Sequence, residues 1–269
     1  MRKILLIGAG KSTPNLIKYL SEQSFKEDWY IDIVDLNTEH VNKFINNNSR
    51  FTLYNDNIIS NNELREQLIS NSDIVISMLP MSMHINIAKE CIKYKKNLVT
   101  ASYVSDEMKN LEKDVIDSNL LFINECGVDP GIDHMSAMQI INNINEMGCE
   151  VIAFESFTGG LLAPDSEKDN PWKYKFTWNP RNVVLAGQGG AAKFIQEGKY
   201  KYIPYHKIFR RTEVINIDGY GKFVGYANRD SLKYRSIYKL DNARTFFRGT
   251  LRRPGFLHSL GCFCSVRYD

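Results

Sequence analysis

The sequence has no strong excess of charge and no long apolar run. A net charge of +3 is too small to indicate nucleic acid or a membrane surface as a partner. No apolar run approaches the roughly 20 residues of a membrane span. The apolar start at residues 3–7 is followed at once by a glycine turn, which favours a buried strand over a signal peptide.

Cysteine is also scarce and irregularly spaced. The five cysteines are Cys91, Cys126, Cys149, Cys262 and Cys264, and they lack the paired spacing of zinc ligands. An odd, scattered set indicates reduced thiols. We therefore expect a cytoplasmic protein with no metal site and no nucleic-acid or membrane partner.

The N-terminal half alternates between short apolar runs and segments with apolar residues at three- and four-residue spacing. The runs predict strands at 3–7, 30–34, 51–54, 74–78, 97–100 and 120–123. The spaced segments predict helices at 12–20, 39–46, 62–69, 83–94 and 105–117. Strands buried on both faces and alternating with helices predict an α/β domain with a doubly wound parallel sheet.

A glycine turn, GAGKST at residues 8–13, joins the first expected strand to the first helix. Gly8 permits a tight turn, and Gly10 lets the backbone approach a pyrophosphate at the helix N-terminus. Thr13 replaces the third glycine of the dinucleotide fingerprint, so a purely structural glycine pair is the alternative. The context favours a Rossmann dinucleotide-binding domain over residues 1–124.

The second expected strand ends in Asp35. In such domains an acidic residue about 20 residues past the glycine turn binds the ribose, and Asp35 lies close to that position. A carboxylate there accepts hydrogen bonds from the ribose hydroxyls and repels a 2′-phosphate. Asp35 therefore favours NAD. NADP stays the alternative because Lys11 could lie near the phosphates, and a simple turn cap is the other interpretation of Asp35.

Two further strands are expected to end at the cofactor crevice, in SMLP at 77–80 and TASY at 100–103. Ser102 and Tyr103 offer hydroxyl groups there, although a helix cap and a packing residue are equally good interpretations. His84 begins the next helix, where we expect a surface or capping residue rather than a catalyst.

The pattern changes after the turn ECGVDPGIDH at residues 125–134. Its glycines, proline, acids and histidine indicate both a domain junction and one wall of an active site. A helix is expected at 135–147, and strands of a mixed sheet at 150–157, 214–217, 223–226 and 245–251. Seven arginines gather at the turns of this half: Arg181, Arg229, Arg235, Arg244, Arg248, Arg252 and Arg253. Arginine binds carboxylates bidentately, which suggests a substrate with several carboxylates. The alternative is a solvated surface charge, which we expect for five of the seven.

The segment GVDPGIDHM at residues 127–135 resembles the G-L-D-P-G-I-D-H-L stretch of saccharopine dehydrogenases of the glutamate-forming type. The resemblance continues through the glycine turn, SMLP, TASY, GGLLAP at 159–164, NPWKYKFTW at 170–178, YANRDS at 226–231 and RGTLR at 248–252. It is expected to end at about Phe256. Residues 125–256 would then be an incomplete α+β substrate and dimerisation domain, followed by an atypical tail at 257–269 of a truncated chain. Thr158 stands where the family has a cysteine, which argues against an essential thiol.

The resemblance implies an oxidoreductase of lysine metabolism. It would interconvert saccharopine with glutamate and α-aminoadipate semialdehyde through an imine, using a nicotinamide cofactor. The residues implied at the cofactor are Gly8, Ala9, Gly10, Lys11, Ser12, Asp35, Leu79, Ala101, Ser102, Val128, Asp129, Pro130 and Thr177. Those implied at the substrate are Ser102, Tyr103, Asp129, Arg229, Thr250, Leu251 and Arg252. Asp129, or a water held by Tyr103, is expected to assist loss of the amine proton.

Two other functions fit the same residues. A carboxynorspermidine dehydrogenase-like enzyme of polyamine synthesis also reduces an imine, although its less acidic product needs fewer arginines. A catalytically incomplete, cofactor-binding fragment is the second alternative, motivated by the tail. We expect a homodimer in each case.

Overall fold

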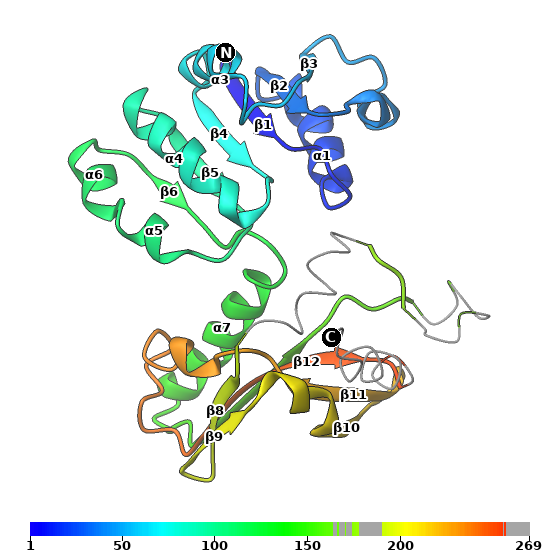
Figure 1. Ribbon diagram of the computed structural model, residues 1–269, viewed down its shortest axis with the longest axis vertical. Coiled ribbons are helices and arrows are strands. Elements are labelled where there is room, and N and C mark those ends of the chain that lie inside the picture. The colour runs from blue at the N-terminus through cyan, green and yellow to red at the C-terminus, as the bar shows by residue number, and fades with distance from the viewer. Residues whose placement is uncertain (164–165, 167–169, 171–173, 178–189, 255, 257–269) are drawn as a thin grey trace, which may run out of the picture. The chain divides into compact units, whose positions relative to one another are not determined.

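The computed structural model describes residues 1–163, 166, 170, 174–177, 190–254 and 256 (Figure 1). These residues form two compact units, Met1–Ile132 and Asp133–Asp269. We expected a domain boundary near residue 125, and the structure divides after Ile132. Arg181 and the tail at 257–269 lie outside the described residues. Within the described part of the chain, no helix is long and apolar enough to span a membrane.

The first unit is built on a six-stranded sheet of order β3-β2-β1-β4-β5-β6. Every pair of neighbouring strands is parallel. This order confirms the predicted doubly wound Rossmann sheet. The strands are β1 (Arg2–Ile7), β2 (Trp29–Asp35), β3 (Phe51–Asn55), β4 (Ile74–Ser77), β5 (Asn97–Thr100) and β6 (Phe122–Ile123).

Helices connect these parallel strands, and local signals set where several begin. The side chains of Asn61 and Ser105 accept hydrogen bonds from backbone N–H groups in the first turns of their helices, and Pro14 opens another. The expected helix at 105–117 is two short helices. The elements are α1 (Pro14–Ser24), η1 (Glu39–Val41), α2 (Asn42–Ile45), α3 (Asn62–Ser70), η2 (Met81–Met83), α4 (His84–Lys93), α5 (Asp106–Lys109) and α6 (Glu112–Asp117).

Strand β1 divides the core of this unit into two. Leu5 and Ile7 belong to one buried cluster, and Ile4 and Leu6 to another, because successive side chains of a strand point to opposite faces. Burying one such side chain stabilises the fold by about 1.5–3 kcal/mol. Because both faces of the sheet are covered by apolar cores, polar site residues lie at the ends of the strands. Ligands bind at the strand ends in such folds.

The second unit contains a helix and a mixed sheet of order β10-β11-β12-β8-β9, with β7 paired to β12. The β7–β12 pair is parallel, and the other pairs are antiparallel. This confirms the predicted mixed sheet. The elements are α7 (Ile132–Glu146), β7 (Ala153–Thr158), β8 (Ala192–Gln196), β9 (Lys199–Ile203), η4 (Tyr205–Arg210), β10 (Thr212–Ile217), β11 (Gly221–Ala227), η5 (Ser231–Tyr234) and β12 (Thr245–Arg252).

The β8–β9 hairpin was absent from our sequence-based prediction. Glu197 and Gly198, which join its strands, have φ angles of 51° and 77°. Positive φ at both positions is typical of a tight type I′ hairpin turn. The signal in the sequence was a two-residue turn with glycine second, between AKFIQ and KYKYI.

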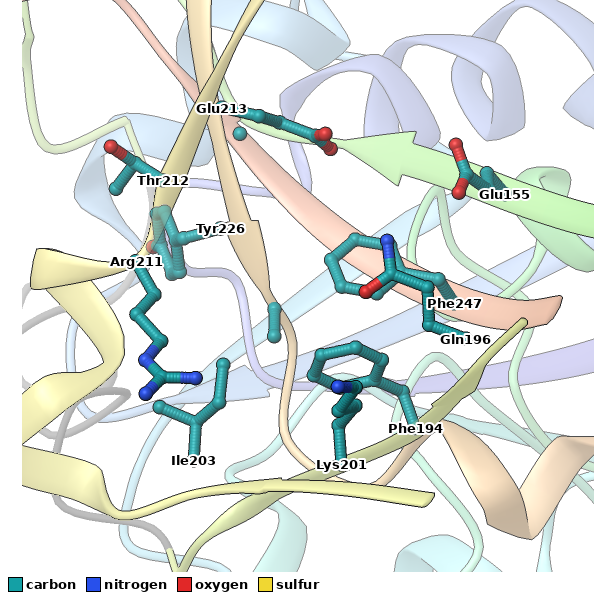
Figure 2. Close-up of a pocket in the computed structure, with 12 residues that line it drawn as sticks. Glu155, Phe194, Gln196, Lys201, Ile203, Arg211, Thr212, Glu213, Tyr226 and Phe247 are labelled. Atoms are coloured by element: carbon teal, nitrogen blue, oxygen red, sulfur yellow. The ribbon is translucent and has the colours of Figure 1, made fainter. Parts of the chain in front are cut away.

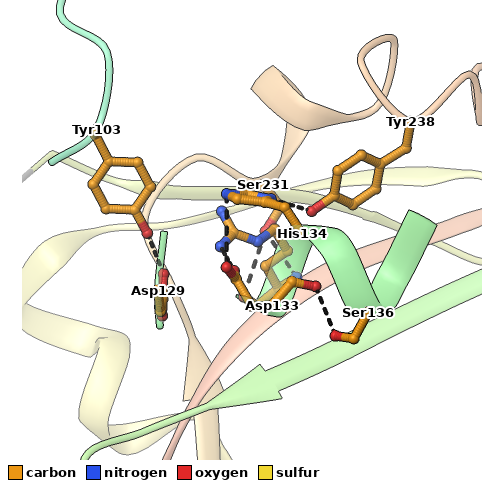
Figure 3. A network of polar contacts seen from close by, with 8 residues as sticks. Tyr103, Asp129, Asp133, His134, Ser136, Ser231 and Tyr238 are labelled. Carbon is orange, nitrogen blue, oxygen red and sulfur yellow. Dashed lines mark hydrogen bonds and ion pairs between the residues drawn. The ribbon is translucent and has the colours of Figure 1, made fainter. Parts of the chain in front are cut away.

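A buried ion pair fixes the start of α7 to β12 in the second unit (Figure 3). Arg248 Nη2 donates to Asp133 Oδ2 at 2.7 Å, and both side chains are almost fully buried. The guanidinium also lies over the ring of Tyr234, 4.3 Å from its centroid. The backbone N–H of Arg248 donates to Ser231 Oγ at 3.0 Å. Arg248, one of the arginines that we associated with substrate, therefore organises the core of this unit.

His134 belongs to the same cluster. Its Nδ1 is hydrogen-bonded to the hydroxyl of Tyr238, and its ring stacks on Tyr234 with 4.6 Å between the centroids. These contacts fit a residue that orients α7.

Replacing Arg248 tests the importance of this pair. We expect Arg248→Ala to lower the free energy of unfolding by about 3–5 kcal/mol, because it leaves the carboxylate of Asp133 buried without its cation. Urea denaturation followed by circular dichroism measures the change. The matched control is Arg244→Ala, an exposed arginine next to the same strand, which should change stability by less than about 0.5 kcal/mol. Equal losses in the two variants would contradict this role.

Candidate active site

The glycine turn after β1 has the shape that a dinucleotide requires. Gly8 has φ of 93°, and a Cβ there would lie 3.1 Å from the backbone of Met78. At Gly10, by contrast, a Cβ would meet nothing within 4 Å. The turn is thus pressed against the end of β4 on one side and open at Gly10, shortly before α1 begins at Pro14. An open backbone at a helix N-terminus fits a pyrophosphate.

Asp35, at the end of β2, holds this turn in place. Its Oδ2 accepts from the N–H of Ala9 at 2.6 Å, and its Oδ1 accepts from the N–H of Asn37 at 3.1 Å. The carbonyl of Ala9 is in turn 2.6 Å from His40 Nε2. The N–H and the carbonyl of Ala9 are therefore both held by hydrogen bonds. The observed contacts are those of a turn-stabilising carboxylate, and a ribose would use the lone pairs that remain.

A histidine bridges the ends of β4 and β5. His84 Nδ1 lies 2.9 Å from Ser77 Oγ, and His84 Nε2 lies 2.8 Å from Ser102 Oγ. His84 is only 3% exposed, so our expectation of a surface or capping residue was wrong. Burial lowers the pKa of His84 to about 4, which leaves the imidazole neutral at pH 7. The histidine therefore contributes hydrogen bonds rather than charge.

The segment after β5 is fastened to the turn that follows β6. Thr100 Oγ1 donates to Asn124 Oδ1 at 2.9 Å, and the N–H of Cys126 donates to the carbonyl of Thr100 at 3.0 Å. The hydroxyl of Tyr103 donates to Asp129 Oδ1 (Figure 3). This last contact brings together the two residues predicted from the sequence to be catalytic.

Two glycines close the turn that carries Asp129. The N–H of Gly127 donates to the carbonyl of Pro130 at 2.9 Å, and the N–H of Ile132 donates to the carbonyl of Gly127 at 3.0 Å. Gly131 has φ of 148°, and a Cβ there would lie 2.1 Å from the oxygen of Gly127. Pro130 is buried inside the turn, whereas Val128 is 69% exposed. Val128 is therefore the apolar side chain that this turn presents outward.

The parallel sheet gathers most of the predicted site residues at one edge. The carboxyl ends of β1, β2, β4, β5 and β6, with the turns that follow them, carry Gly8, Ala9, Gly10, Lys11, Ser12, Asp35, Leu79, Ala101, Ser102, Tyr103, Val128, Asp129 and Pro130. The second unit carries the remaining ones, Thr177, Arg229, Thr250, Leu251 and Arg252. The ligand-binding roles of all these residues stay predictions.

Thr250, Leu251 and Arg252 are the last three residues of β12. The guanidinium of Arg252 is buried over the rings of Tyr174 and Phe256, at 5.3 and 5.4 Å from their centroids. Its Nη1 donates to the carbonyl of Leu251 at 2.8 Å, and its buried Nε has no hydrogen-bond partner among the described residues. A buried guanidinium with spare donors fits a carboxylate.

Arg229 differs from Arg252 in its exposure. It follows β11, its side chain is exposed, and its backbone has φ of 40°. Its carbonyl accepts from the N–H of Lys193 at 2.8 Å, so the backbone is anchored to β8 while the side chain reaches solvent. Thr177 is likewise exposed.

The second unit also has a hollow that the sequence did not indicate (Figure 2). It measures about 260 Å³ and contains none of the predicted site residues. Phe194 and Phe247 contribute apolar surface, and Glu155, Glu213 and Arg211 contribute charge. Burial, followed by the nearby carboxylate of Glu155, raises the pKa of Glu213. These residues come from strands that are far apart in the sequence, which explains why no local motif revealed them.

Two family models cover nearly the whole chain. The saccharopine dehydrogenase NADP binding domain matches residues 4–123, and the saccharopine dehydrogenase C-terminal domain matches residues 127–266. The second match runs past Phe256, where we expected the resemblance to end. The first points to NADP rather than to the NAD that Asp35 led us to expect.

Individual relatives agree with the family models. The saccharopine dehydrogenase [NADP(+), L-glutamate-forming] of Schizosaccharomyces pombe is 35% identical over 271 residues, which cover 100% of this chain and 58% of the relative. The mitochondrial alpha-aminoadipic semialdehyde synthase of Mus musculus is 35% identical over 98% of this chain and 28% of its own length. The solved apo saccharopine dehydrogenase (L-Glu forming) of Saccharomyces cerevisiae has a TM-score of 0.84 and 30% identity, over 97% of this chain and 57% of that one. The chain therefore spans less than two thirds of the length of these relatives.

Gly131 offers a test of the turn at 127–131. We expect Gly131→Ala to lower the free energy of unfolding by about 2–4 kcal/mol, because the new Cβ collides with backbone and the residue needs a positive φ. Differential scanning calorimetry measures the change. Gly10→Ala is the control, since a Cβ there meets nothing within 4 Å. An unchanged melting temperature for Gly131→Ala would show that the turn is not closed as described.

His84 predicts a dependence of stability on pH. Its pKa in the folded protein, about 4, lies below the ordinary value of 6.5, so the unfolded chain binds more protons between these values. The free energy of unfolding should therefore fall as the pH drops from 6.5 to 4, with His84 contributing roughly 3 kcal/mol of that fall. Urea denaturation at several pH values, compared between the wild type and His84→Gln, isolates this contribution. Identical pH slopes for the two proteins would contradict it.

Proposed function

Because the chain belongs to the saccharopine dehydrogenase family, we propose that it interconverts saccharopine with glutamate and α-aminoadipate semialdehyde through an imine, with NADP(H). The observation that carries the proposal is the hydrogen bond between Tyr103 and Asp129, at the same sheet edge as the open glycine turn. That edge supplies a proton-accepting carboxylate beside a cofactor site. The arginines of the second unit supply cations for an anionic substrate.

The residues of the first unit fit a dinucleotide. The backbone from Gly10 to Ser12, at the N-terminus of α1, would hold the pyrophosphate. Lys11 is exposed in this turn and adds a positive charge near the phosphates. When bound, a nicotinamide cofactor supplies or accepts the hydride at the imine carbon.

NADP is our proposal over NAD for two reasons. The matching domain is the NADP binding domain of the family, and several relatives carry NADP(+) in their names. In addition, both oxygens of Asp35 already accept backbone hydrogen bonds, which stabilise its charge within the turn. Asp35 therefore has a structural role in the turn that does not require NAD, so its presence alone no longer argues for that cofactor.

Asp129 is the group that we assign to proton transfer. In the direction of saccharopine oxidation, the secondary amine must lose its proton before hydride leaves the adjacent carbon. The carboxylate of Asp129 would accept that proton, and the hydroxyl of Tyr103 would orient the carboxylate through its hydrogen bond. In the reverse direction the same carboxyl group would return the proton.

Saccharopine carries three carboxylates, and two arginines are assigned to them. Arg252 is buried over two aromatic rings, which lowers the local dielectric and strengthens its attraction for a carboxylate. Arg229 is exposed and reaches outward from the end of β11. Thr250 offers a hydroxyl group on the same strand as Arg252. A substrate with fewer carboxylates would leave these groups unused.

Steady-state kinetics with saccharopine and either NADP⁺ or NAD⁺ test the proposal. We expect turnover with a preference for NADP⁺, and we expect Asp129→Asn to lower kcat by about 100-fold through loss of a positioned base. The KM for NADP⁺ should stay within about threefold, because the Asp129 side chain serves proton transfer. Lys18→Ala, a solvent-exposed change on α1, is the control and should behave as wild type.

The alternatives give different results in the same assays. Turnover of carboxynorspermidine but not saccharopine would replace the proposed substrate, and a preference for NAD⁺ would refute the proposed cofactor. NADPH binding without turnover of either substrate would indicate a cofactor-binding fragment. We also propose a homodimer and a cytoplasmic location, from the family resemblance and the cysteine usage. Sedimentation equilibrium tests the dimer.

A further inference from the structure

Ser77, His84 and Ser102 form a chain of hydrogen bonds that the proposed mechanism does not use. It starts at the end of β4, passes through the first residue of α4 and ends just after β5. Ser77 is 0% exposed and His84 is 3% exposed, whereas Ser102 is partly exposed. The Ser77 end of this hydrogen-bond chain is therefore closed to solvent, and the Ser102 end is accessible to it.

We infer that His84 is a positioning residue that donates from Nε2 to Ser102 Oγ, so that the Ser102 hydroxyl is directed as a donor toward an oxygen of a bound ligand. This inference rests on the proposed function only in placing that ligand at the sheet edge. The oxygen could come from the cofactor or from the substrate. The chemistry is the same in both cases, a hydrogen-bond acceptor facing Ser102.

The direction of the hydrogen bonds follows from the buried end. Ser77 Oγ has no hydrogen-bond partner other than His84 among the described residues. If it accepted from His84, its own hydrogen would be buried without an acceptor, which costs more than an unused lone pair. Ser77 therefore donates to Nδ1, and the neutral imidazole must then carry its hydrogen on Nε2. Ser102 Oγ accepts that hydrogen and keeps its own for a ligand.

The closed end also excludes a role in moving protons to solvent. A proton taken up at Ser102 would have to leave through Ser77, which is fully buried. Charging the imidazole is also unfavourable, because burial disfavours the cationic form. His84 therefore acts through Ser102 and has no acid–base role of its own.

Ser102 is well placed to use such a directed hydroxyl. Its carbonyl accepts from the N–H of Glu125 at 3.2 Å, so its backbone is fixed to the turn that carries Asp129. The next residue, Tyr103, reaches Asp129 itself. With the backbone anchored, the hydrogen bond from His84 fixes the one remaining freedom, the rotation of the Ser102 hydroxyl group.

The tautomer of His84 is the direct test, and it needs no ligand or turnover. Long-range ¹H–¹⁵N correlation spectra of the full chain distinguish the two neutral tautomers. With five histidines in the sequence, His84→Gln identifies the His84 signals by their loss. We expect the Nε2–H form near pH 7, and the same form in Ser77→Ala, because an Nδ1–H there would be buried without an acceptor. A wild-type His84 in the Nδ1–H form, or a charged imidazole, would overturn the inference.

Binding measurements then test the consequence for the ligand. NADPH affinity is measured by fluorescence titration, and the KM for saccharopine by kinetics, in His84→Leu, Ser102→Ala and the double variant. We expect His84→Leu to weaken one of the two ligands by about tenfold, and to have little further effect once Ser102 is alanine. If the NADPH affinity changes, the oxygen that faces Ser102 belongs to the cofactor. If the KM for saccharopine changes, it belongs to the substrate. Additive losses would mean that His84 acts independently of Ser102, and would contradict the inference.

Two further variants separate positioning from folding. In His84→Gln the amide keeps a donor toward Ser102, so we expect affinity within about threefold of wild type. If His84→Leu does not fold, His84→Phe replaces it, because it keeps a ring at this position but cannot donate to Ser102. Absence of saccharopine turnover in the wild type would count against the proposed function alone, since the NMR result and the NADPH titration do not depend on it.

Discussion

The hydrogen bonds that tie the end of β5 to the turn after β6 are the constraint on which the candidate site depends. They fix the backbone of Thr100 and Ser102, and they bring the Tyr103 hydroxyl to Asp129. The same turn leads into α7, where Asp133 is held by Arg248. One short segment therefore supplies a carboxylate to the edge of the first unit and, four residues later, the buried carboxylate that anchors the helix of the second.

Much of the fold could be predicted because it depends on local pattern. Apolar runs such as residues 3–7 and 30–34 indicate largely buried strands, and their alternation with helices favours parallel pairing. The β8–β9 hairpin escaped because its strands mix lysines and tyrosines with apolar residues, so that only the Glu197–Gly198 turn marked it. A strand of this kind is recognised by its partners rather than by its own composition.

The site was predictable where a motif is continuous and not where contacts join distant segments. The glycine turn, Tyr103 and Asp129 could be singled out from short motifs. The burial of His84 could not, because it follows from the neighbouring positions of β4 and β5 in the sheet. Arg248 looked like a ligand for carboxylates, and it does bind one, but the carboxylate is that of Asp133. Sequence indicates what a side chain can bind, and the fold decides which partner it meets.

The contacts of Asp35 have a consequence for how such a domain can change its cofactor in evolution. The residue at this position, which we expected at the ribose, braces the N–H of Ala9, so in our proposal selectivity and loop shape share one side chain. A substitution of Asp35 that favoured a different nucleotide would also remove a hydrogen bond that stabilises the glycine turn. A loop that loses Asp35 therefore needs another contact to hold it, and His40, already bonded to the carbonyl of Ala9, supplies one.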